Sequence, residues 1–123
     1  MDEKTPPVLI SDEFAKEMST AASQVFQAMA TQGFHRPGSV RTMAHYMGMV
    51  MTELAEAIEA DRKGLGTQAS EKIPGFTNLA EELADAIIRL MDTSVVYGID
   101  IGAAIQAKMK YNAGRQYRHG REY

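Results

Sequence analysis

The segment from Asn78 to Gly98 has the strongest helical pattern in the chain, and it reads NLAEELADAIIRLMDTSVVYG. When successive residues are placed about 100° apart around a helix, all its charged side chains fall within one arc of about 100°. Leucine, isoleucine, valine, methionine and alanine fill most of the remaining circumference. A helix this apolar is mostly buried, and one small domain has few ways to cover it. Partner subunits are therefore expected.

Two helices are expected before this segment. Ser11 is a suitable N-cap residue, and apolar residues at helical spacing follow it until Gly33. Ser39 is the expected N-cap of a second helix, which is predicted to run for roughly 24 residues to Gly64. Residues 64–77 contain three Gly and one Pro, so they predict a loop.

The quoted segment has its own start signal, and one more helix is expected after it. Asn78, with Glu81 three residues later, resembles a capping box. Asp100 can cap a fourth, shorter helix from Ile101 to about Asn112. Short connections favour antiparallel neighbours, so the pattern predicts an all-α fold, an antiparallel helical bundle of about four helices completed by oligomerisation.

Composition agrees with a single helical domain. The chain has 123 residues, of which 45% are hydrophobic and 24% charged, with 9 Met, no Cys and no Trp. We expect one domain over residues 1–123, with residues 1–10 as a leader and residues 115–123 as a basic tail. The absence of cysteine excludes disulfides and Cys-ligated metal centres, so any metal ion must be bound by oxygen or by histidine.

The charges are distributed unevenly along the chain. Residues 1–107 carry 8 basic and 15 acidic side chains, whereas residues 108–123 carry 5 basic and 1 acidic. A broad basic stripe suited to duplex DNA is missing, so we expect no nucleic-acid partner. No apolar run resembles a membrane span or a signal peptide, so we expect a cytoplasmic protein with no membrane partner.

Two pairs of carboxylates lie three residues apart on the second and third expected helices: Glu53 with Glu56, and Glu82 with Asp85. This spacing puts each pair on one helical face, where the two charges repel each other. Only Asp85 has a basic residue four positions later, namely Arg89. If the pairs face each other, the excess charge needs an external cation, and ligation by oxygen alone points to Mg²⁺, with Mn²⁺ as a substitute.

The apolar residues of the second expected helix indicate which face is buried. The expected core stripe consists of Val40, Met43, Met47, Val50, Met51, Leu54 and Ile58. Glu53 and Glu56 fall on a different arc, shared with Met and Ala, which indicates a semi-enclosed surface. The alternative is that the carboxylates are ordinary solvated charges of a non-catalytic helical oligomerisation module.

Three sequence elements resemble a known family when taken together: ELAE at 53–56, EELAD at 81–85 and KMKYNAGRQYRHG at 108–120. In order and spacing they are similar to the motifs of the MazG-like, all-α nucleoside triphosphate pyrophosphohydrolases. One departure is Thr52, which stands where many members have a further Glu. The resemblance implies Mg²⁺-dependent hydrolysis of a (deoxy)nucleoside triphosphate to the monophosphate and pyrophosphate, by a homodimer or homotetramer.

The resemblance also implies roles for individual residues. The metal-binding carboxylates are matched by Glu53, Glu56, Glu82 and Asp85, and the phosphate-contacting residues by Lys108, Asn112 and Arg115. Glu53 is the expected base that takes a proton from water. Aromatic residues near the first turn, Phe34, His35 and Tyr46, are candidates for contact with the nucleobase. A phosphoribosyl-nucleotide is an alternative substrate.

Overall fold

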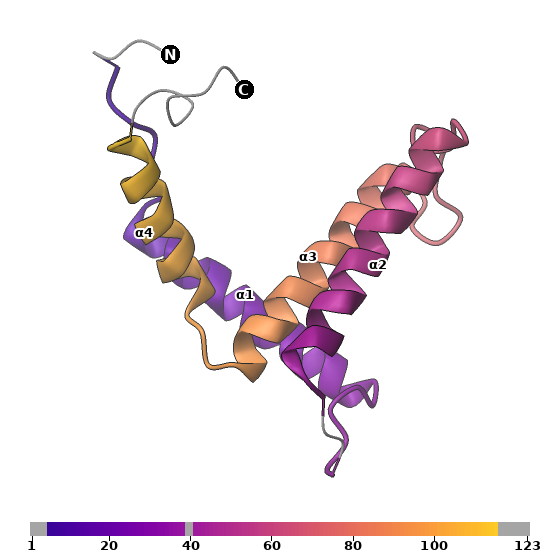
Figure 1. Ribbon diagram of the computed structural model, residues 1–123, viewed down its shortest axis with the longest axis horizontal. Helices are drawn as coiled ribbons and strands as arrows, with labels where there is room; N and C mark the ends of the chain where they lie inside the picture. Colours follow the sequence, from indigo (N-terminus) through magenta and orange to yellow (C-terminus); the bar gives the residue numbers. More distant parts are fainter. Residues whose placement is uncertain (1–4, 39–40, 116–123) are drawn as a thin grey trace.

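Four α-helices and their connections make up the computed structural model, which describes residues 5–38 and 41–115 (Figure 1). The helices are α1 (Asp12–Thr31), α2 (Met43–Arg62), α3 (Asn78–Val96) and α4 (Ile101–Ala113). Within these residues there is no strand, and no helix has the length and apolar character needed to cross a bilayer. The expected all-α fold with four helices is confirmed.

The helices form two pairs, α2 with α3 and α1 with α4, and contacts between α1 and α3 join the pairs (Figure 1). One pair is the α2–α3 hairpin, in which the two helices run antiparallel and side by side. The other is the α1–α4 pair, in which α4 runs back along the amino-terminal half of α1. Because α1 also packs on α3, the two pairs meet at one end, and their other ends point apart.

Two helix starts occur where the sequence predicts them. Ser11 Oγ accepts a hydrogen bond from the Phe14 amide at 3.1 Å, and Asp100 Oδ1 accepts one from the Ala103 amide at 3.2 Å. Each cap satisfies a backbone N–H that has no partner within its own helix. The first and fourth helices are therefore confirmed with their caps.

The start of α2 differs from the prediction. Thr42 is its N-cap: the residue has an extended backbone, and its hydroxyl accepts the His45 amide at 3.2 Å. The helix therefore begins at Met43 and has 20 residues, fewer than expected. Ser39, the predicted cap, lies outside the described residues. Threonine, like serine, is a good capping residue, and it takes this role three residues later in the chain.

The start of α3 is displaced by one residue. Thr77, rather than Asn78, is the N-cap, and its Oγ1 accepts the Ala80 amide at 3.1 Å. The predicted capping box does not form, because the Glu81 carboxylate accepts a hydrogen bond from Ser70 Oγ at 2.5 Å. Glu81 thereby anchors the preceding loop instead of its own helix end.

The α1–α4 pair depends on close backbone approach. A Cβ atom on Gly102 would lie 1.8 Å from the carbonyl oxygen of Ala15, so only glycine fits at this position. Ser19 Oγ accepts the Gly102 amide at 2.9 Å and donates to Asp100 Oδ1 at 2.5 Å. These contacts fix the first turn of α4 against the middle of α1.

Few large apolar side chains are buried among the described residues. The buried apolar residues are Ala15, Ala22, Val50 and Ala86. Val40 of the predicted core stripe lies outside the described residues, and most of the other members are exposed, with Met51 at 67% and Ile58 at 56%, so that prediction is wrong for the single chain. The reason is that α2 turns Val50 and Glu53 inward, which leaves much of the stripe on the outside. On α3, Ile87 is likewise 52% exposed.

Candidate metal centre

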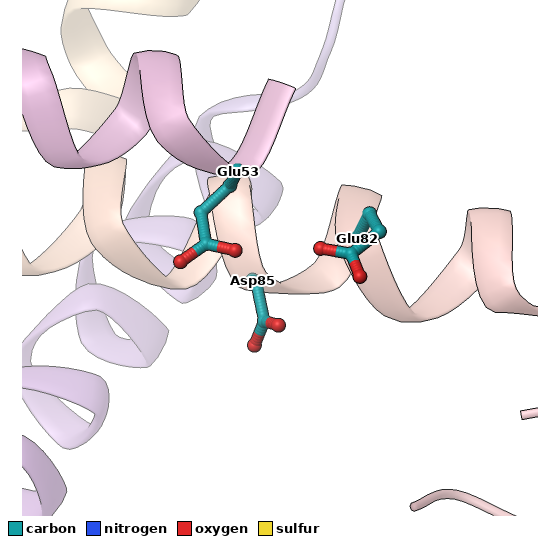
Figure 2. Close-up of side chains that lie close together, drawn as sticks. All are labelled: Glu53, Glu82 and Asp85. Carbon is teal, nitrogen blue, oxygen red and sulfur yellow. The ribbon is translucent and has the colours of Figure 1, made fainter. Parts of the chain in front are cut away.

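Three carboxylates meet in the α2–α3 hairpin. Glu53 of α2 and Glu82 and Asp85 of α3 each have an oxygen atom within 4.8 Å of the others. Figure 2 shows Glu53 extending from α2 toward α3, while Glu82 points along α3 toward Glu53. The three-residue spacing puts Glu82 and Asp85 on one face of α3, and the antiparallel neighbour brings Glu53 to that face. We call these three residues the carboxylate cluster.

Glu56, the fourth predicted ligand, adjoins the cluster through Glu82. Burial, a hydrogen bond with the Glu56 carboxyl and the Glu56 charge raise the pKa of Glu82 to about 7. Two carboxyl groups can share a hydrogen bond only when one of them is protonated. The Oε2 atom of Glu82 is buried, and no N–H group or hydroxyl group donates to it. Such an oxygen requires either a proton or a cation.

Arg89 pairs with Glu53 and not with Asp85, the partner that its helical spacing predicts. Its Nε donates to Glu53 Oε1 at 2.7 Å across the hairpin. Glu53 is the most enclosed residue of the carboxylate cluster, only 7% exposed, and a buried carboxylate without a donor is costly. Arg89 therefore lies beside the carboxylate cluster and places a positive charge there.

The net charge around Asp85 is negative. Burial is the main effect that raises the pKa of Asp85, and the charges of Glu53 and Glu81 raise it further. Lys72 and Arg89 act in the opposite direction without cancelling the rise. The site therefore favours the uptake of positive charge.

The donor set fits a hard divalent cation. All the potential metal ligands in the cluster are carboxylate oxygens, and one of these oxygens is the buried Glu82 Oε2, which has no hydrogen-bond partner. Oxygen ligands of this kind suit Mg²⁺ and Mn²⁺ better than softer metals. The carboxylate cluster can therefore hold a metal ion.

The predicted phosphate-contacting residues lie elsewhere. Lys108 and Asn112 are exposed on α4, and Arg115 is exposed just beyond its end. The Lys108 ammonium lies 4.6 Å from the centre of the Tyr111 ring, and the Arg115 guanidinium lies 5.6 Å from it. Because α4 is packed on α1, away from the hairpin (Figure 1), one chain does not bring these residues to the carboxylates.

The candidate base-contacting residues Phe34, His35 and Tyr46 all have packing contacts or are half-buried. His35 Nε2 lies 2.6 Å from Oδ1 of the buried Asp92, and its ring stacks on Phe26 with centroids 4.6 Å apart. The Tyr46 ring meets the edge of Tyr97 at 5.9 Å. These contacts join the first turn and α2 to α3, and contact with a base stays a prediction.

Sequence reasoning missed two cationic residues beside the carboxylates. Arg89 shares the charged arc of α3 with Glu82 and Asp85, and that arc was a usable signal for its place in the site. Lys72 lies in the loop between α2 and α3, with its Nζ 3.8 Å from Glu81 Oε2. Helical periodicity carries no information about a loop residue, so no pattern in the sequence could have found Lys72.

Comparison of this chain with protein-family models, with curated proteins and with solved structures finds no match.

Proposed function

We propose that this chain is an Mg²⁺-dependent nucleoside triphosphate pyrophosphohydrolase. The observation that carries the proposal is the carboxylate cluster of Glu53, Glu82 and Asp85, with oxygens within 4.8 Å of one another and Glu56 beside them. The motif resemblance to the MazG-like family supports the same chemistry. The substrate would be a ribo- or deoxyribonucleoside triphosphate.

The four carboxylates would hold Mg²⁺, with Mn²⁺ as a substitute. A divalent cation bound there supplies a coordinated water of lowered pKa and neutralises charge on phosphate oxygens. Among the described residues, the buried Glu82 Oε2 is the side-chain atom that lacks a hydrogen-bond partner and would gain most from such a cation.

The proposed reaction is an in-line displacement at the α-phosphorus. A water oxygen forms a bond to that phosphorus while the bond to the oxygen bridging the α- and β-phosphates breaks. Pyrophosphate leaves with the bonding electrons, and the nucleoside monophosphate remains. Glu53 would accept the proton from water, because Arg89 holds only one of its oxygens, at 2.7 Å, and orients the carboxylate.

A second copy of the chain would complete the site. Lys108 and Arg115 would bind the β- and γ-phosphates through charge-assisted hydrogen bonds, with Asn112 beside them. Since one chain keeps α4 away from the hairpin, these side chains would come from a partner in a homodimer or homotetramer. The exposed apolar residues of α2 and α3 supply a surface for this association.

The test is the product pattern from a panel of nucleotides. Purified protein would be incubated with Mg²⁺ or Mn²⁺ and each common ribo- and deoxyribonucleoside triphosphate, together with a phosphoribosyl-nucleotide. Equal amounts of monophosphate and pyrophosphate are the expected products. Release of orthophosphate, or no turnover of any compound, would contradict the proposal. Light scattering tests the assembly, and a stable monomer would overturn the two-copy site.

A further inference from the structure

The loop between α2 and α3 is built as a fixed structure against the start of α3. The Asn78 amide donates to the Gln68 carbonyl at 2.9 Å, and the Leu79 amide donates to the Gly66 carbonyl at 3.0 Å. The next two amides of α3 are satisfied by the side chain and the carbonyl of the cap residue, Thr77. No amide in this first turn is left for an anion, so positive charge near the cluster must come from side chains.

Ser70 ties the loop to the helix that carries the metal ligands. Its side chain is buried, and its Oγ donates to Glu81 Oε1 at 2.5 Å. The same oxygen accepts the amides of Lys72 at 3.2 Å and Ile73 at 3.1 Å. Glu81 directly precedes Glu82 in the sequence, so this network fixes the Lys72 backbone relative to the carboxylate cluster.

The Lys72 side chain itself is accessible. It is 82% exposed, and its Nζ is 3.8 Å from Glu81 Oε2, which is a long and weak ion pair. Its charge acts on Asp85, where it lowers the pKa against the effect of the surrounding carboxylates. Arg89, the other cation that acts on Asp85, is bonded to Glu53 at 2.7 Å. Lys72 is therefore the more available of these two cations.

We propose that Lys72 binds the polyphosphate of the substrate from the same chain that supplies the carboxylates. This inference rests on the proposed function and adds a binding residue that the motif resemblance does not include. The triphosphate would lie between the metal-binding carboxylates and the loop. The network of Ser70 and Glu81 would hold the lysine backbone in place before the substrate arrives, so only the side chain has to be ordered on binding.

The experiment uses calorimetry with the full chain, first with Mn²⁺ alone and then with inorganic tripolyphosphate in the presence of Mn²⁺. Lys72→Met removes the charge, Lys72→Arg keeps it, and Lys63→Met is the matched control. Lys63 is also an exposed lysine, but it pairs with Glu59 at 3.5 Å along α2. Because one charge-assisted contact is lost, Lys72→Met should weaken tripolyphosphate binding about tenfold. It should not weaken Mn²⁺ binding.

The outcomes separate this inference from the proposed function. Lys72→Arg should bind tripolyphosphate within about threefold of the unmodified chain, and Lys63→Met should bind it equally well. If the unmodified chain binds Mn²⁺ and tripolyphosphate while Lys72→Met binds both as tightly, the role of Lys72 is refuted and the proposed function stands. If the unmodified chain binds neither, both proposals fail.

Discussion

The α2–α3 hairpin and the α1–α4 pair are both antiparallel helix pairs, yet their contacts differ in kind. The α1–α4 contact relies on close backbone approach, with Gly102 set against Ala15. The hairpin instead buries Glu53, which needs Arg89 as a partner at 2.7 Å. A buried ion pair is a poor way to gain stability, because desolvation offsets most of the Coulomb attraction. Since α1 and α4 associate without one, stability alone does not explain the buried charge in the hairpin.

The pairs also differ in charge. The hairpin gathers carboxylates, whereas the end of α4 carries exposed cations such as Lys108. Figure 1 shows the far ends of the two pairs pointing apart, so the proposed site, which needs both charges, would draw them from different copies.

The largest effect is expected from Asp85→Asn, which removes one charge from the cluster with almost no change in shape. Pyrophosphate release should fall about a thousandfold, because a ligand for the cation that stabilises the transition state is lost. Circular dichroism should show unchanged helicity, because Asp85 is only partly buried on α3. Glu59→Gln is the matched control, because Glu59 is exposed on α2. The activity of this variant should stay within about twofold of that of the unmodified chain. Equal activity of the two variants would refute the metal role of Asp85.

The second prediction tests whether the two charged regions meet between copies. Asp85→Asn chains are mixed with chains carrying both Lys108→Met and Arg115→Met, each inactive alone. In a two-fold dimer, half of the randomly formed dimers would have one intact site, so activity should return to about a quarter of the unmodified level. The measurement is pyrophosphate release after the mixture is unfolded and refolded together. Recovery would be absent if all the groups came from one chain.

The helix starts show what local sequence can predict. Ser11 and Asp100 cap their helices as expected, because capping depends on a side chain and an amide three residues later. Thr77 takes the position predicted for Asn78, since two good capping residues adjoin and local rules do not choose between them. Grouping of the carboxylates is also local within each helix, because three-residue spacing defines one face.

Rules for capping and helical spacing do not predict which helix faces contact each other. Helical periodicity divides α2 into faces but does not say which face meets α3, and Met51 on the predicted core stripe is 67% exposed. Arg89 has an acidic residue four positions before it, yet it pairs with Glu53, 36 residues away in the sequence. The relative burial of the two carboxylates decides this choice, and burial follows from the packing of the whole hairpin.

The third prediction concerns the ion pair between Arg89 and Glu53 in the hairpin. Arg89→Met leaves the buried Glu53 carboxylate without its donor, and it should lower the free energy of unfolding by about 2 kcal/mol. Urea denaturation measures this loss. Arg62→Met, at the exposed end of α2, is the control and should change stability by less than about 0.5 kcal/mol. Mn²⁺ should restore part of the loss in Arg89→Met, because a cation can replace the missing charge.

The smallest effect is a dependence on pH that separates the two helix pairs. Burial and Glu56 raise the pKa of Glu82 from 4.5 to about 7. Between these two pH values Glu82 keeps its proton in the folded chain and loses it in the unfolded chain. Without metal, the free energy of unfolding should therefore fall as pH rises from about 4.5 to about 7, and then level off. Measurement of the denaturation midpoint in urea at several pH values tests this sign.

Metal binding should show the opposite trend, because Mn²⁺ and the proton compete for Glu82. If one proton is displaced, the Mn²⁺ association constant should rise by about tenfold per pH unit below about pH 7 and change little above it. Glu82→Gln should flatten both profiles, whereas Glu59→Gln should keep them. A stability profile that keeps its slope in Glu82→Gln would show that the titrating group is not Glu82, and Asp85, whose pKa is also raised, would be the next group to test. If Glu82→Gln abolishes the slope and Glu59→Gln does not, the proton belongs to Glu82 of the hairpin, and no group of the α1–α4 pair is needed to explain the dependence on pH.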